Sequence, residues 1–123
     1  MTAYSNLAYA QPMTAVKTPR SAEYDVIAGV TRRLSAASAR RKTDYPTFAS
    51  ALSDNELLWS TLAADVATEG NGLPPALRAR LFYLYRFTTE HSRKVRAGTA
   101  SPEVLVDINT AVLRGLRGEG TSE

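Results

Sequence analysis

The stretch from Leu73 to Gly98, LPPALRARLFYLYRFTTEHSRKVRAG, most constrains what this chain can fold into. At about 100° per residue its central positions form one apolar helical stripe, and aromatic residues fan out on both sides of that stripe. The stripe consists of Leu77, Leu81, Leu84, Thr88, His91 and Val95, and the flanking aromatic residues are Phe82, Tyr83, Tyr85 and Phe87. Such a helix needs contacts on more than one side. We expect either the central helix of a small bundle or a surface that a partner covers.

The length and composition indicate one folded domain. The chain has 123 residues, of which 44% are hydrophobic and 22% charged, and this balance is typical of a globular protein. It contains no cysteine, which excludes disulfides and thiolate ligands and gives no sign of an oxidising compartment. No apolar run approaches the roughly 20 residues of a membrane helix, and the start lacks the pattern of a secretory signal. We therefore expect a cytoplasmic protein without membrane insertion.

Cap and turn signals predict the first two helices. Thr18-Pro19 is typical of a helix start, and the basic run at 40–42 suits a helix C-terminus. Asp44 can cap the second helix, whose apolar periodicity continues through Ser53-Asp54-Asn55. This continuity favours one helix, although the same cap-like residues could begin a new helix near Leu57.

Glycine-containing turns separate the later helices. Gly70-Asn71-Gly72 predicts a stop, Pro74-Pro75 opens the third helix and Gly98 ends it. Ser101-Pro102-Glu103 begins a fourth helix. The buried stripe of that helix is predicted to be Leu105, Ile108, Val112 and Leu116. No segment alternates like a strand. We expect an all-α fold, a small bundle of about four helices with short loops over residues 18–118, with a flexible N-terminal arm over 1–17 and a disordered polar tail over 119–123.

The sequence contains few residues or motifs that would indicate an enzyme. His91 is the only histidine, so a metal site would have to be completed by carboxylates, and no Glu-x-x-His or His-x-x-x-His spacing occurs. A serine nucleophile elbow and a phosphate-binding glycine loop are also missing from the sequence. We expect a protein that is not an enzyme and has no metal, cofactor or small-molecule substrate. His91 is interpreted as a packed or rim residue.

Three residues on or beside the apolar stripes allow two interpretations each. Trp59 is either a core residue or an interface hot spot. Asn55 could cap a helix, and Asn109 could fix the helix register through a buried hydrogen bond. Alternatively, each asparagine contacts the backbone of a partner at a binding surface.

The basic residues also allow two interpretations. The formal net charge is +3, and arginine and lysine pairs are spread over three of the predicted helices. Most lie near helix C-termini, where the helix dipole and solvation account for them. If they gather on one side of the bundle, they would suit RNA or an acidic protein surface.

Several stretches together resemble the alphaproteobacterial FlaF family of flagellar biosynthesis regulators. They are TPRSAEYDVIAGVTRRL (18–34), ALSDNELLWSTLAADVA (51–67), NGLPPALRARLFYLYRFTTEHSRKVRAG (71–98) and INTAVLRGLRG (108–118). The resemblance implies a cytoplasmic protein without enzymatic activity that is required for flagellin production and export. It also implies that the protein acts together with flagellin and with the companion regulator FlbT. No catalytic residue is carried over.

Our leading hypothesis is a flagellin-binding chaperone or adaptor, in which the helical body receives an amphipathic flagellin segment. The residues predicted to bind the partner are Trp59, Phe82, Tyr83 and Phe87 for the apolar contact, and Arg78, Arg80 and Arg93 for a charged rim. The alternative is a post-transcriptional regulator that acts on flagellin mRNA, directly or through FlbT. RNA binding of this kind would weaken steeply with salt.

Overall fold

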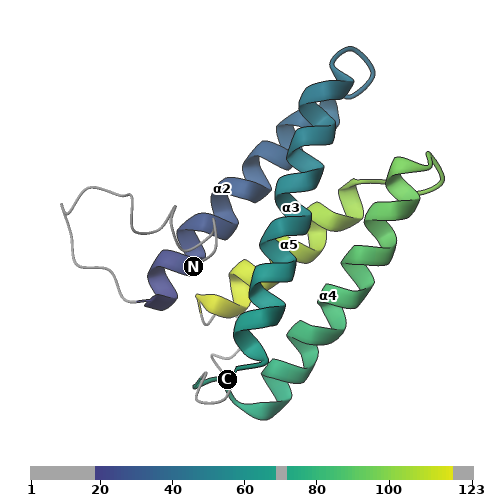
Figure 1. The fold of residues 1–123 in the computed structure, drawn as a ribbon. Coiled ribbons are helices and arrows are strands. Elements are labelled where there is room, and N and C mark those ends of the chain that lie inside the picture. The colour runs from purple at the N-terminus through teal and green to yellow at the C-terminus, as the bar shows by residue number, and fades with distance from the viewer. Residues whose placement is uncertain (1–18, 69–71, 118–123) are drawn as a thin grey trace.

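The computed structural model describes residues 19–68 and 72–117, which form a bundle of four helices (Figure 1). The helices are α2 (Pro19–Ala39), α3 (Tyr45–Val66), α4 (Pro75–Arg96) and α5 (Glu103–Leu116). This confirms the all-α prediction. The predicted arm and tail lie outside the described residues. Within the described part of the chain, no helix is both long enough and apolar enough to cross a membrane.

The helices are arranged in a ring, in which α2 packs against α3 and α5, and α4 packs mainly against α3. The contact between α4 and α5 is the weakest of the neighbouring pairs, and α2 does not pack against α4. In Figure 1, α5 passes behind α3. The side of the bundle between α4 and α5 is therefore its least closed side.

Local signals explain the start and the continuity of α3. The Asp44 carboxylate accepts a hydrogen bond from the backbone N–H of Thr47 at 3.3 Å, which satisfies a free amide of the first turn. The helix runs unbroken through Ser53-Asp54-Asn55, so the prediction of one continuous helix is confirmed. It ends at Val66, before the predicted glycine stop, of which residues 70 and 71 lie outside the described residues.

The predicted turn between α4 and α5 is also confirmed. Gly98 has a φ of 80°, a left-handed conformation that glycine adopts without steric penalty. Its N–H donates to the Val95 carbonyl at 3.0 Å, and the Thr99 N–H donates to the Lys94 carbonyl at 2.9 Å. The Ser101 hydroxyl then accepts from the backbone N–H of Glu103 at 3.2 Å, where α5 begins. These bonds hold the two helices in a tight connection.

The core consists of two apolar clusters along the bundle. One contains Ile27, Val30, Leu58, Trp59, Leu62, Val66 and Leu81. The other contains Leu34, Ala37, Phe48, Ala51, Leu52, Val95 and Leu105. The stripe predicted for α5 is only partly right, because Leu105 is fully buried whereas Ile108, Val112 and Leu116 are half-buried. The physical reason is the weak packing of α5 against α4.

A buried polar network crosses the core. The Trp59 indole N–H donates to the Oδ1 of Asn109 at 2.9 Å, and the Nδ2 of Asn109 donates to the Oδ1 of Asn55 at 2.7 Å and to the Thr31 hydroxyl at 3.1 Å. Both asparagines are 0% exposed. The prediction that Asn109 makes a buried hydrogen bond is therefore confirmed. The cap interpretation of Asn55 and the partner interpretation of both residues are wrong, because Asn55 lies in mid-helix and neither side chain reaches the surface.

Candidate partner-binding surface

Three large aromatic side chains of α4 remain exposed, and all three were predicted to bind a partner. Phe82 is 43% exposed, Tyr83 67% and Phe87 39%. Their exposure follows from the packing of α4, which buries only Leu81, Thr88, Ser92 and Val95. The contact arc is too narrow to cover every ring of this helix.

The structure divides these aromatics between two faces of α4. Tyr83, Phe87 and His91 follow one another at four-residue intervals, so they lie along one face, and Arg80 continues this row by one turn. The Phe87 and His91 rings stack with centroids 5.5 Å apart and planes inclined by 19°. We call Arg80, Tyr83, Phe87 and His91 the α4 strip. At 1.5 Å per residue the strip is about 16 Å long.

Phe82 is not part of this strip. It is rotated by about 100° from Tyr83 around the helix axis. Its ring lies against Tyr85, with centroids 5.7 Å apart. The sequence analysis correctly placed aromatic residues on both sides of the stripe. The grouping of Phe82 with Tyr83 and Phe87 in a single contact surface does not follow from the geometry.

His91 fixes one end of the α4 strip. Its Nε2 lies 2.8 Å from the backbone oxygen of Ser101, at the start of α5. A carbonyl oxygen only accepts, so Nε2 carries the hydrogen and donates this bond. The imidazole therefore links α4 to the following loop and supports the Phe87 ring that stacks on it. This agrees with the interpretation of His91 as a rim residue.

Half-buried apolar side chains border the strip on the less closed side of the bundle. Leu77 and Leu84 of α4 pack against the first core cluster without being fully covered, and so do Ile108 and Val112 of α5. The α4 strip therefore continues a surface on which apolar groups are incompletely removed from water. Surfaces of this kind often mark sites of interaction with other proteins.

The three predicted rim arginines have different surroundings. The Nε of Arg78 donates to the Val66 carbonyl at 2.9 Å and so satisfies a free acceptor at the end of α3. Arg93 pairs with Glu90 one turn away on the same helix. Arg80 is exposed and has no ion pair with any described residue. Of these three arginines, only Arg80 thus remains unpaired among the described residues, and the predicted rim of three arginines is not assembled.

Comparison with known proteins decides the family. Residues 5–116 match the model of the flagellar protein FlaF. The chain belongs to the FlaF family. Membership in the FlaF family implies a role in flagellum biogenesis, and this family is not a known family of enzymes. The searches of curated proteins and of solved structures found no match.

The prediction that Trp59 contacts a partner is wrong. Its side chain is 2% exposed and lies in the first core cluster, with its indole N–H bonded to Asn109. A ring in this position offers no surface to a partner, so the core interpretation is the right one. Tyr45 (49% exposed) and Leu57 (47% exposed) are further exposed apolar residues that were not predicted. The position of Leu57 outside the apolar stripe of α3 was the signal that could have revealed it.

The described part of this FlaF chain holds no group of three or more histidine, aspartate or glutamate side chains that could bind a metal. The arrangement on α4 combines exposed aromatic rings with a cation, on a helix that Arg78 links to α3 and His91 links to the loop before α5. Chemically, it can bind another polypeptide through apolar burial and steer it by charge.

Proposed function

We propose that this FlaF-family chain binds flagellin in the cytoplasm as a chaperone or adaptor that supports flagellin synthesis and export, and that the α4 strip is the contact surface. The observation that carries this proposal is the exposure of Tyr83 and Phe87 along one face of a helix whose opposite side packs in the bundle. Family membership supplies the biological setting. The occupant would be an amphipathic helical segment of flagellin.

The dimensions of the strip suit such an occupant. A length of about 16 Å corresponds to three helical turns, enough for apolar residues at positions i, i+4 and i+7 of a partner helix. Tyrosine and phenylalanine lose little conformational entropy when they are covered, since each has only two side-chain torsions. Arg80 would speed the encounter with an acidic segment more than it tightens the complex.

The test is a calorimetric titration of purified flagellin into the wild-type chain and into a Tyr83→Ala/Phe87→Ala variant. Truncation of interface aromatics commonly costs more than about 1 kcal/mol each, so binding should weaken at least about tenfold. Leu57→Ala is the matched control, because Leu57 is comparably exposed on α3, outside the strip. It should bind flagellin like the wild type.

Two further measurements sharpen this experiment. Phe82→Ala reports whether flagellin reaches the second aromatic face of α4. Repeating the titration with FlbT tests whether the companion regulator uses the same surface. Absence of saturable binding of flagellin to the wild-type chain at tens of micromolar, or equal losses in the strip variant and in Leu57→Ala, would remove the proposal.

A further inference from the structure

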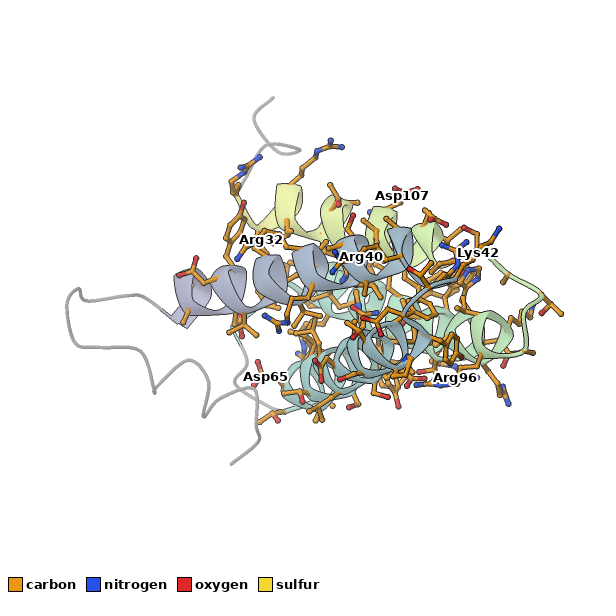
Figure 2. All side chains as sticks on the ribbon, turned by 90° about the horizontal axis from the view of Figure 1, so that it is seen from above. Arg32, Arg40, Lys42, Asp65, Arg96 and Asp107 are labelled. Carbon is orange, nitrogen blue, oxygen red and sulfur yellow. The ribbon has the colours of Figure 1, made fainter. Side chains whose placement is uncertain are left out.

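A second surface lies between α2 and α3, on a part of the molecule that does not include α4. The two helices enclose an open cavity of about 460 Å³ beside the turn that joins them. We call it the α2–α3 groove. Its walls include Arg33 and Ala36 from α2, Arg40 from the turn directly after α2, and Ser50, Ala51 and Asp54 from α3. Figure 2 shows Arg40 near the C-terminal end of α2.

The charges in the α2–α3 groove are unevenly distributed. Arg33 lies on α2 and Arg40 is the first residue after its end, seven residues further along the chain, which at the helical rise separates them by about 10 Å. Both are exposed, and neither forms an ion pair with any residue in the described ranges 19–68 and 72–117. Asp54 provides the single carboxylate of the lining and lies on the opposite wall. One wall of the groove therefore carries two unneutralised positive charges.

Gly29 lies one turn before Arg33 on α2 and is buried. A Cβ at this position would meet only the ends of the Arg33 and Arg32 side chains, at 3.5 and 3.8 Å. These are ordinary contacts, so the fold itself does not require a glycine here. A mid-helix glycine costs about 0.5–1 kcal/mol relative to alanine. Gly29 is buried and does not line the groove, so it takes no part in the proposed contact.

We propose that the α2–α3 groove binds an acidic helical segment of a protein partner, with carboxylates spaced seven residues apart to face Arg33 and Arg40. The small side chains of Ala36, Ser50 and Ala51 admit the apolar surface of such a helix. Asp54 fixes its orientation, because a carboxylate of the partner is repelled from the α3 wall. This site is separate from the α4 strip, so the chain can hold two partners at once.

The lining favours a protein segment over nucleic acid. Binding of single strands combines a basic groove with aromatic residues on which bases stack. The residues that line the α2–α3 groove include no aromatic ring, and Asp54 would repel a phosphate backbone. Two arginines at heptad spacing match a helix more closely than they match a continuous line of phosphates.

The experiment uses a fluorescent alanine-based helical peptide of about 20 residues with glutamates at heptad spacing, and a second peptide with glutamine in their place. Anisotropy at low salt is measured with the full chain. The glutamate peptide should bind saturably, and the glutamine peptide at least about tenfold more weakly. Arg33→Gln/Arg40→Gln should weaken binding by a similar factor, whereas Asp54→Asn should tighten it.

Matched controls separate this site from general charge attraction and from the flagellin proposal. Arg80→Gln/Lys94→Gln removes the same charge from exposed positions on α4 and should leave peptide binding unchanged. Tyr83→Ala/Phe87→Ala should also leave it unchanged, whatever its effect on flagellin.

Four outcomes of these peptide titrations would overturn the inference. They are no saturable binding, equal binding of the two peptides, equal losses in the two arginine double variants, and weaker binding after Asp54→Asn. Displacement of the peptide by a single-stranded RNA that binds more tightly would assign the arginines to nucleic acid instead, and would also overturn it. All the substituted residues are exposed. The thermal unfolding midpoint of each variant, compared with that of the wild type, checks that the fold is intact.

Discussion

Replacement of Asn109 by alanine should destabilise the bundle more than the same replacement at Asn55. Both side chains are 0% exposed and both lie inside helices, so the change in apolar burial and the cavity left behind are similar. The hydrogen bonds differ. Asn109 bonds with Trp59, Asn55 and Thr31, whereas the side chain of Asn55 bonds, among residues 19–68 and 72–117, to Asn109 alone.

The difference in free energy follows from this count. Asn109→Ala removes three hydrogen bonds and Asn55→Ala removes one, and a net hydrogen bond contributes about 0.5–1.5 kcal/mol. The two additional bonds make Asn109→Ala worse by about 1–3 kcal/mol. In the Asn55→Ala variant, Asn109 still bonds with Trp59 and Thr31. In addition, the Nδ2 of Asn55, which lacks a partner within the described part of the chain, disappears.

Urea unfolding measures this difference directly. Trp59 is the only tryptophan of the chain and lies within the network, so its fluorescence reports the unfolding of the core. Far-UV circular dichroism on the same samples checks that unfolding is two-state. Equal free energies of unfolding for the two variants, or a larger loss for Asn55→Ala, would refute the view that Asn109 is the centre of the network.

Three further predictions concern helix ends. Arg78→Met should lower the free energy of unfolding by about 1 kcal/mol in urea titrations, because the Val66 carbonyl at the end of α3 loses its donor. Gly98→Ala should cost about 1–2 kcal/mol by the same assay, since a φ of 80° is unfavourable for a residue with a Cβ. Hydrogen bonds from Ser101 and from its own backbone N–H, with the charge of Arg41, lower the pKa of Glu103. The stability that this gives is present above the unfolded pKa of about 4.3 and is lost as pH falls through the lower folded value. A carboxyl titration by NMR should show a midpoint that rises in Ser101→Ala.

The positions and ends of the helices could be predicted because they depend on neighbours in the sequence. Asp44 caps α3 through Thr47, and Gly98 ends α4 through bonds within a single turn. These signals act over three to five residues, and the apolar periodicity repeats them along each helix. Short-range signals in the sequence were therefore sufficient to predict the helices without any knowledge of tertiary contacts.

The partners of the buried polar residues could not be predicted in the same way. Asn109 meets Trp59 and Asn55 across sequence separations of 50 and 54 residues. The bond between Arg78 and Val66 could not be predicted either, because it depends on how α3 and α4 dock. Such contacts depend on helix order and rotation, which periodicity does not specify. The exposure of Tyr83 and Phe87 was predictable because it needs only the number and angular spread of apolar positions.

The distribution of polarity on α4 argues that its outer rings serve a purpose other than folding. Two of the four side chains that α4 buries are polar, Thr88 and Ser92, and the Ser92 hydroxyl has no hydrogen-bond partner among the described residues. On the outside of the same helix, Tyr83 and Phe87 face water. Selection for stability alone would favour the opposite arrangement, since burial of a phenylalanine is worth about 1.5–3 kcal/mol and an unpaired buried hydroxyl costs about 1–3 kcal/mol. An exposed apolar surface of this kind is expected to persist where another polypeptide covers it.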